Sequence, residues 1–321
     1  MRTAIKLYLA PLRGFTDATF RNTYWRHFGG AFDVAVTPFV TSVKGKRVKR
    51  THLKDIWPEN NSAAPLIPQI LSKNADHFVT LAKAMADMGY GCINWNLGCP
   101  YVMVAKKGRG SGLLPYPEQI DAILEKFFTS VPCRLSVKTR LGRFSGDEIF
   151  KLMPIFNRYP LSELIVHART GVQMYTGAPD LERFAQVSAL SDHPVVYNGD
   201  ITSLSSFTLL ANRFKAVNRW MIGRGVLANP FLPLDIKAGE DHIDAKVAKM
   251  KRFHDDLFHT YCEILYGPAH PTDRMKGFWS YFARSYKNGD KFLKKIRKTK
   301  SIAQYQQVAD RFFNHEALVK E

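Results

Sequence analysis

Residues 92–100 read Cys92-Ile93-Asn94-Trp95-Asn96-Leu97-Gly98-Cys99-Pro100, a short apolar run that ends in a sharp turn. The run predicts a buried strand over Cys92–Gly98. Gly98 permits an unusual backbone conformation, and Pro100 prevents the strand from continuing. Such a turn can hold the thiol of Cys99 over a pocket, although a lone cysteine is more often a small buried apolar residue. The sequence on either side decides between these interpretations.

Seven further runs of this kind, short, apolar and rich in β-branched residues, lie along the chain. They are Ile5–Pro11, Val34–Val40, Leu66–Leu71, Arg134–Leu141, Leu164–Ala168, Pro194–Asn198 and Trp220–Gly223. Stretches with helical spacing separate most of them, including Asp76–Met88, Pro117–Phe128 and Ser203–Phe214. Eight strands alternating with helices predict an α/β fold, a parallel (β/α)8 TIM barrel. A doubly wound open sheet is the alternative, but no glycine fingerprint opens the first helix, which argues against a Rossmann domain.

The pattern changes after Pro230. Helical spacing continues over Asp244–Leu265, Arg274–Tyr286 and Ser301–Asn314, and no further strand pattern follows. We therefore predict two domains, a catalytic barrel over residues 1–239 and an all-helical domain over residues 240–321.

The positive charge of the chain is large and partly clustered. The 321 residues carry a formal net charge of +18. Three clusters stand out, namely Lys44, Lys46, Arg47, Lys49 and Arg50; then Lys106, Lys107 and Arg109; and a third within residues 284–300 that includes Lys287, Lys291, Lys294, Lys295, Arg297 and Lys298. A single cluster is usually a solvated face. Three of them, one directly after Cys99, favour a nucleic-acid partner.

Several classes of protein fit the sequence poorly. No apolar run is long enough to cross a bilayer, and the N-terminal segment reads as a first strand with no signal peptide. The four cysteines, Cys92, Cys99, Cys133 and Cys262, match no zinc spacing and no redox pair. We expect a cytoplasmic monomer that binds neither a metal ion nor a membrane.

Polar residues cluster at the carboxyl ends of the predicted strands, where a barrel enzyme keeps its active site. They are Gln69, Asn96, Lys138, Arg140, His167, Asn198 and Arg224. Two-residue alternation places Lys138 and Arg140 on one face of a buried strand, where they need a partner. An ion pair with Asp200 would satisfy them. An anionic ligand is favoured, and a flavin fits because its reduced form carries negative charge near N1 and O2.

Two glycine-containing turns end the last two strands. Asn198-Gly199-Asp200 and Gly223-Arg224-Gly225 occupy the place where barrels usually bind a phosphate. His167 would lie between this phosphate site and Lys138, so a cofactor contact is favoured over a purely structural role. Gln69 could pair with the pyrimidine edge of a flavin, although a glutamine at a strand end says little alone.

Six motifs in order resemble those of the tRNA-dihydrouridine synthase family. They are residues 9–17 (Leu-Ala-Pro-Leu-Arg-Gly-Phe-Thr-Asp), 96–100 (Asn-Leu-Gly-Cys-Pro), 137–142 (Val-Lys-Thr-Arg-Leu-Gly), 167–170 (His-Ala-Arg-Thr), 198–201 (Asn-Gly-Asp-Ile) and 221–225 (Met-Ile-Gly-Arg-Gly). Their order and spacing hold across the whole barrel. Within this pattern, Ala168 stands where glycine is commoner in the family and Gly112 where alanine is frequent. Both are small-for-small changes that leave the expected activity unchanged.

The resemblance implies an FMN-dependent enzyme that reduces a uridine in tRNA to 5,6-dihydrouridine with NADPH. It implies that hydride passes from flavin N5 to uracil C6 and that Cys99 donates a proton to C5. A thiol with an ordinary pKa near 8.5 stays protonated at neutral pH, as a general acid requires. The residues implied to bind FMN are Pro11, Leu12, Arg13, Gln69, Lys138, His167, Asn198, Gly199, Asp200, Gly223 and Arg224. Those implied to face the uracil or the tRNA are Asn96, Arg140, Arg274 and Lys276.

Two other functions fit some of these features. One is an FMN barrel that acts on a free pyrimidine, similar to the dihydroorotate dehydrogenases, but a small substrate has no need of three basic clusters. The other is a catalytically silent RNA-binding barrel, against which the presence of both Cys99 and Lys138 argues.

Overall fold

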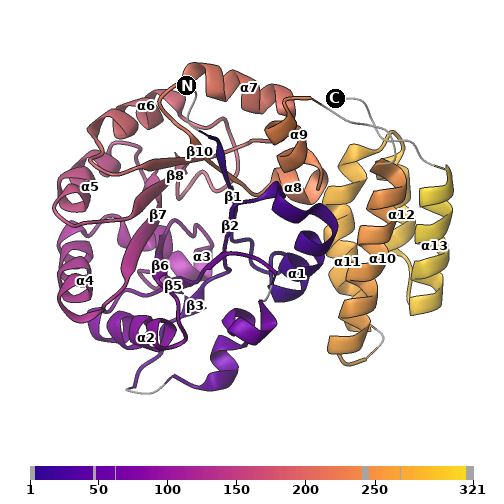
Figure 1. Cartoon of the computed structure of the whole chain (residues 1–321), viewed down its shortest axis with the longest axis horizontal. Helices are drawn as coiled ribbons and strands as arrows, with labels where there is room; N and C mark the ends of the chain where they lie inside the picture. The colour runs from indigo at the N-terminus through magenta and orange to yellow at the C-terminus, as the bar shows by residue number, and fades with distance from the viewer. Residues whose placement is uncertain (1–3, 46–47, 62, 241–245, 268, 316–321) are drawn as a thin grey trace.

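The computed structural model describes residues 4–45, 48–61, 63–240, 246–267 and 269–315. A barrel of parallel strands is surrounded by helices, and four helices pack together at one side of it (Figure 1). The strands are β1 (Lys6–Leu9), β2 (Val34–Val36), β3 (Val40–Thr41), β4 (Leu66–Ile67), β5 (Gln69–Leu71), β6 (Cys92–Leu97), β7 (Arg134–Gly142), β8 (Glu163–Thr170), β9 (Val195–Asn198) and β10 (Arg219–Ile222). The barrel helices are α1 (Ala18–Phe28), α2 (Ala75–Asp87), α3 (Val102–Ala105), α4 (Pro117–Ser130), α5 (Glu148–Asn157), α6 (Leu181–Leu190), α7 (Leu204–Arg213), α8 (Arg224–Ala228) and α9 (Leu232–Ala238). The side helices are α10 (Lys246–Ile264), α11 (Ala269–Phe282), α12 (Gly289–Arg297) and α13 (Ile302–His315).

The strands close into one barrel of eight. The strand order is β3-β5-β6-β7-β8-β9-β10-β1-β2-β4. A proline splits each of two predicted strands, so that Val34–Val40 appears as β2 and β3, and Leu66–Leu71 as β4 and β5. Pro38 separates β2 from β3, and Pro68 separates β4 from β5, since proline has no N–H to continue the ladder. β2 pairs with β4 beside β1, while β3 pairs with β5 beside β6, so the circle is complete. The prediction of a (β/α)8 barrel is confirmed.

The predicted barrel helices begin and end close to the expected residues. Asn74 begins α2 by accepting a hydrogen bond from the N–H of His77, and Ser203 begins α7 with a reciprocal capping box. The crossover between β3 and β4 contains 3₁₀ turns over residues 50–56 and 58–60 and no α-helix among its described residues.

The inside of the barrel is filled below its mouth. Tyr8, Val36, Ile165, Val196 and Met221 form an apolar cluster there and are fully buried. Because a packed interior leaves no pore, a ligand can only enter at the carboxyl ends of the strands.

The C-terminal helices pack around an aromatic centre. The ring of Trp279 lies 4.3 Å from that of Phe292 and 5.0 Å from that of Phe312. Helix α11 begins at Ala269, five residues before the predicted start at Arg274, and the expected start of α10 at Asp244 lies outside the described residues. Helix α12 was not predicted, because its many lysines hide the buried positions Phe292 and Ile296.

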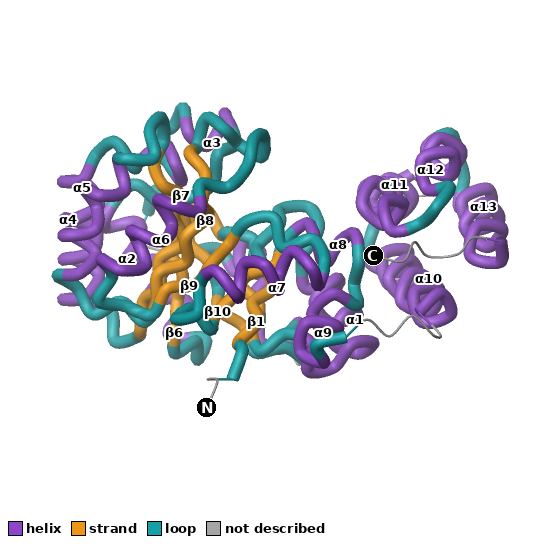
Figure 2. The backbone as a smooth tube through the Cα atoms, turned by 90° about the horizontal axis from the view of Figure 1, so that it is seen from above, coloured by secondary structure: helices purple, strands orange, loops and turns teal. Residues whose placement is uncertain are grey.

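These helices dock on α1 and on the loop that precedes it. The Phe20 ring stacks on Phe278 with a centroid distance of 5.5 Å, and the Tyr261 hydroxyl donates to Asp17 Oδ1 at 2.8 Å. One apolar core therefore runs from barrel to tail, and the division at residue 239 stays a prediction. In Figure 2, α3, which follows the end of β6, and the helices α11 and α12 all lie toward the top of the view.

Candidate active site

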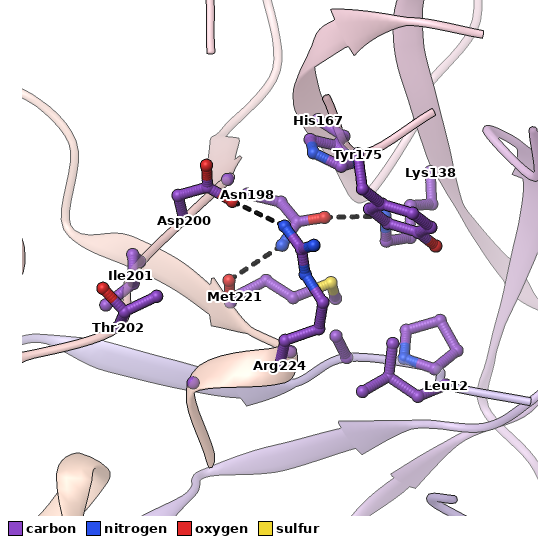
Figure 3. Close-up of a pocket in the computed structure, with 15 residues that line it drawn as sticks. Leu12, Lys138, His167, Tyr175, Asn198, Asp200, Ile201, Thr202, Met221 and Arg224 are labelled. Atoms are coloured by element: carbon purple, nitrogen blue, oxygen red, sulfur yellow. Dashed lines mark hydrogen bonds and ion pairs between the residues drawn. The ribbon is translucent and has the colours of Figure 1, made fainter. Parts of the chain in front are cut away.

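A cavity of about 540 Å³, open to solvent, lies at the carboxyl ends of β8, β9, β10 and β1. Nine of the eleven residues expected to bind FMN line it, namely Pro11, Leu12, Lys138, His167, Asn198, Gly199, Asp200, Gly223 and Arg224. Lys138, His167 and Tyr175 gather at one end of the cavity, and Asp200, Ile201 and Thr202 at the other (Figure 3). Arg224 lies between these ends.

Lys138 brings a positive charge to the cavity without a carboxylate partner. Its Nζ donates to Asn198 Oδ1 at 2.8 Å, and the Asn198 amide is held in turn because its Nδ2 donates to the Met221 carbonyl at 2.9 Å. In the part of the chain that the structure describes, no ion pair to Lys138 is formed. Burial, together with the charge of Arg140, lowers the pKa of Lys138 to about 7. A bound anion would restore its charge.

Asp200, the carboxylate considered for Lys138, is held by arginines instead. Arg169, which is 1% exposed, donates from both terminal nitrogens to the Asp200 carboxylate, and Arg224 Nη2 donates to Asp200 Oδ1 at 2.8 Å. Burial alone raises the pKa of Asp200, but these hydrogen bonds and charges outweigh it and lower the pKa below its usual value. The carboxylate therefore stays ionised and fixes the positions of two arginines.

His167 is buried and neutral. Arg169 Nη1 lies 3.2 Å from His167 Nε2, and because an arginine can only donate, Nε2 must accept. The ring proton is therefore on Nδ1. Burial, followed by the charges of surrounding arginines and of Lys138, lowers the pKa of His167 well below its usual value. The sequence presents Arg169 only as part of a motif, so its role as an anchor for both His167 and Asp200 was missed.

Two turns touch at the far end of the cavity. A Cβ on Gly225 would lie 2.1 Å from the Ile201 carbonyl oxygen, so only glycine permits this approach. Residues 199–202 and 223–225 line the cavity here together with the Arg224 side chain. Backbone N–H groups and an arginine at such a corner form a suitable environment for a phosphate.

The turn that carries Cys99 is fixed by hydrogen bonds from three sides. Asn96 Oδ1 accepts from the Gly98 N–H at 3.1 Å and from the Cys99 N–H at 2.8 Å. Arg140 Nε donates to the Gly98 carbonyl at 2.9 Å. The Ser111 N–H and hydroxyl both donate to the Cys99 carbonyl, at 3.1 and 3.0 Å.

The Cys99 thiol is half-buried, and burial raises its pKa above the usual value. The Tyr101 N–H and the charges of Arg140, Arg13 and Lys138 oppose this shift without cancelling it. The group is therefore a protonated thiol at neutral pH, which can donate a proton, and is not an activated thiolate.

A chain of side-chain amides supports this turn from inside the barrel. Asn96 Nδ2 donates to Gln69 Oε1 at 2.7 Å, and Gln69 Nε2 donates to Asn94 Oδ1 at 2.7 Å. Asn94 Nδ2 donates to Ser136 Oγ at 2.8 Å. Both ends of the Gln69 amide are thus paired, and Gln69 does not belong to the cavity wall. Its expected contact with a flavin stays a prediction.

Other expected residues lie around the mouth rather than in the cavity. Arg13 is exposed and covers the Phe39 ring at 5.7 Å. Arg140 is buried, donates to the Thr170 carbonyl, and lies 5.4 Å from the Tyr175 ring. Tyr175 was missed by the sequence reasoning, because an aromatic residue in the loop after β8 carries no motif. Its ring also lies 4.6 Å from the Arg224 guanidinium.

The expected tRNA-facing residues of the tail have partners within the protein. Arg274 donates to the Gly14 carbonyl in the loop before α1 and covers the Tyr261 ring at 5.4 Å. Lys276 donates to the Thr299 carbonyl at 2.8 Å.

The basic clusters remain largely in solvent. Lys106 and Lys107 are exposed beside the Cys99 turn, whereas Lys46 and Arg47 of the first cluster lie outside the described residues. The exposed cations of the third cluster are Arg284, Lys287, Lys291, Lys294, Lys295, Arg297, Lys298 and Lys300.

The described residues offer neither a metal site nor a membrane span. They contain no group of three or more His, Cys, Asp or Glu side chains placed to hold a metal ion. None of the helices within the described ranges combines the length and the apolar character that crossing a bilayer needs.

Comparison with known proteins agrees with this geometry. A probable tRNA-dihydrouridine synthase 2 of Bacillus subtilis is 28% identical over 95% of the chain and 93% of its own length. A probable tRNA-dihydrouridine synthase of Staphylococcus epidermidis is 27% identical over 95% of the chain and 92% of its own length. The fold is similar to that of an old yellow enzyme homologue from Zymomonas mobilis, with a TM-score of 0.53 and 12% identity over 76% of this chain and 91% of that chain. The model of the dihydrouridine synthase (Dus) family matches residues 8–316, so the chain belongs to this family of tRNA-modifying enzymes.

Proposed function

We propose that this enzyme reduces a uridine of tRNA to 5,6-dihydrouridine, with FMN bound in the cavity and NADPH as the reductant. The observation that carries the proposal is the pairing of two unusual groups at one barrel mouth. One is the Lys138 amine, which has only a neutral hydrogen-bond partner. The other is the Cys99 thiol, which burial keeps protonated.

The residues present fit FMN. Lys138 would face the N1–O2 edge of the ring system, which becomes anionic on reduction, and its lowered pKa leaves it ready to gain a proton there. The corner formed by Gly199–Thr202, Gly223 and Arg224 would hold the phosphate. When bound, FMN supplies the hydride that the uracil receives at C6.

Cys99 would complete the reduction from the other side of the mouth. A proton held on Sγ can pass to uracil C5 as negative charge develops there, because the thiol is protonated at neutral pH. Asn96 and Arg140 hold the Cys99 turn and would also be close to the base. Both side chains are themselves buried, which fixes their positions beside the thiol.

The tRNA would lie across the mouth and the tail. Exposed lysines after Cys99 and on α12 belong to elements on the same side of the molecule (Figure 2). Unstacking the target uridine costs a few kcal/mol, as it does for other bases that leave a stack. Contacts between these lysines and tRNA phosphates would offset that cost.

The test begins with the purified protein. Denaturation should release FMN, and the NADPH-reduced protein should be reoxidised by tRNA that lacks dihydrouridine but not by orotate. Reoxidation by orotate would favour an enzyme of free pyrimidines. A protein without flavin, unable to take up added FMN but binding tRNA, would instead be a silent RNA-binding barrel.

A further inference from the structure

The loops that follow β6, β7 and β8 carry many exposed apolar side chains. Eight of the fourteen large apolar side chains exposed in the described chain belong to these three consecutive loops. They are Tyr101, Val102, Met103, Tyr116, Phe144, Val172, Met174 and Tyr175, and we call them the apolar rim. A soluble protein rarely leaves such a group in water unless the surface binds something.

Hydrogen bonds connect the three loops to one another. Arg143 Nη1 in the β7 loop donates to Ser111 Oγ, whose hydroxyl donates to the Cys99 carbonyl in the β6 loop. The Val172 N–H in the β8 loop donates to the Arg143 carbonyl at 3.0 Å. The loops that carry the apolar rim are therefore fixed relative to one another and to the turn that holds Cys99.

Phe144 is the most exposed member, and hydrogen bonds hold the backbone on both sides of it. Its side chain is 67% exposed, yet the Glu148 carboxylate accepts hydrogen bonds from three consecutive N–H groups, those of Arg143, Phe144 and Ser145, at 2.8, 2.9 and 3.0 Å. The Arg143 guanidinium lies 5.6 Å from the Phe144 ring. A rigid backbone that presents an aromatic ring to solvent beside a cation is suited to stacking a flat partner.

The surroundings of the rim favour RNA over a second protein copy. Lys106, Lys107 and Arg143 lie in the same loops, so two copies meeting here would bring like charges together. Unstacked nucleotides offer phosphates for these cations and π-faces for the rings. A target base that leaves its stack also exposes the faces of its neighbours.

We propose that the apolar rim stacks the unpaired bases that flank the target uridine, with Phe144 as the main platform. The inference rests on the proposed function, because it takes tRNA as the substrate. It adds a surface that holds the nucleotides on either side of the target, with Phe144 outside the cavity that Tyr175 lines.

The test compares four variants of the full-length protein. Phe144→Ala and Phe144→Leu remove the ring, Phe144→Trp keeps a stacking surface, and Leu209→Ala truncates a side chain that is 73% exposed on α7, away from the mouth. We expect the Ala and Leu variants to weaken tRNA binding and raise the KM by roughly 5- to 100-fold, the effect of losing one stacked base. Phe144→Trp should retain the affinity, and Leu209→Ala should match the wild type. The salt dependence of binding should not change, because no charge is removed.

A second measurement separates this inference from the proposed function. Quenching of 2-aminopurine in a short single-stranded RNA reports stacking directly, whether or not uridine is reduced. Loss of quenching in Phe144→Ala and Phe144→Leu supports the platform. Wild-type quenching and tRNA affinity in both variants would overturn it, as would a change in oligomeric state with tRNA binding intact. Failure of the proposed function would appear earlier, as a wild-type protein that holds no flavin.

Discussion

The two sides of the barrel mouth are built by different means. On the β5–β6 side, side-chain amides hold the Cys99 turn, from Asn96 through Gln69 to Asn94, and Arg140 is the one cation among these contacts. On the cofactor side, which runs from Lys138 on β7 to β10, charged groups dominate, with Asp200 bridging Arg169 and Arg224. The difference teaches that geometry governs the proton-donor side, whereas charge governs the cofactor side. Changes on the two sides should therefore have separable effects.

Replacing Arg169 should have the largest effect on the charged side. Arg169→Met leaves the Asp200 carboxylate with Arg224 alone and frees His167 Nε2 and the Gly177 carbonyl. We expect bound flavin to fall from stoichiometric to trace, and the free energy of unfolding to drop by about 2–3 kcal/mol, less than for a fully buried pair. Flavin absorbance and thermal unfolding measure these changes.

Arg213→Met provides the matched control, because Arg213 pairs with Glu182 on the outer surface. This variant should keep its flavin, and its free energy of unfolding should fall by about 1 kcal/mol or less. If Arg169→Met retained full flavin content, charge would not organise the cofactor side.

A side chain at position 110 should displace the Cys99 turn without affecting flavin binding. Gly110 has φ of +57°, and a Cβ there would lie 2.8 Å from the Cys99 carbonyl oxygen. Gly110→Ala should displace the thiol and lower kcat on tRNA by roughly 10- to 100-fold, since small misplacements of a reacting group are costly. Flavin content and the rate of flavin reduction by NADPH should be unchanged.

Gly89→Ala isolates the strain of the substitution. Gly89, at the end of α2, has φ of +93°, and a Cβ there would meet no other atom within 4 Å. This variant should lose stability but keep its kcat. Equal losses of kcat in both variants would show that strain alone is responsible.

Titration should sharpen the description of the charged side. The pKa of Lys138 is lowered to about 7 in the free protein, and an anion bound beside it favours the protonated form. Above pH 7, anaerobic binding of reduced FMN, which is anionic at its N1–O2 edge, should therefore take up a proton, and the affinity should fall by up to about tenfold per pH unit. Binding titrations in weakly buffered solutions with a pH indicator measure both effects.

Lys138→Arg tests whether Lys138 causes this pH dependence, because a guanidinium remains protonated throughout this pH range. The affinity of this variant for reduced FMN should not change with pH above 7, whatever its absolute value. The same pH dependence in both proteins would mean that another group titrates.

Removing a contact between the tail and the barrel should have the smallest effect, because this contact lies outside both sides of the mouth. Arg274→Ala removes a hydrogen bond to the Gly14 carbonyl and should lower the free energy of unfolding by about 1–2 kcal/mol. Exposed Lys287→Ala should leave stability unchanged. If Arg274 instead contacts a tRNA phosphate, its loss should reduce the salt slope of tRNA binding by about one, with little change in stability.

The fold was predictable because its signals are local. The alternation of apolar runs and helical stretches depends on residues near one another in the sequence, and even the two proline breaks can be read from it in retrospect. The bounds of the tail were less accessible, since α12 combines many lysines with only a few buried positions such as Phe292.

The site was predictable where a residue follows a strand and carries chemistry. Lys138, Asn198 and Arg224 line the cavity as expected. Pairings between distant segments were not predictable. The choice of Arg169 over Lys138 as the partner of Asp200, and the burial of Gln69 beneath the Cys99 turn, depend on three-dimensional distances that no spacing encodes.

The most direct test of the account is a single turnover of the reduced enzyme with tRNA that lacks dihydrouridine. Cys99→Ala should bind flavin stoichiometrically and be reduced by NADPH at the wild-type rate, but its reoxidation by tRNA should slow by roughly 10²- to 10⁴-fold, the usual share of a general acid. Cys262→Ala, which alters a thiol on α10, should behave like the wild type. Reoxidation of Cys99→Ala at the wild-type rate would contradict the claim that this thiol supplies the proton.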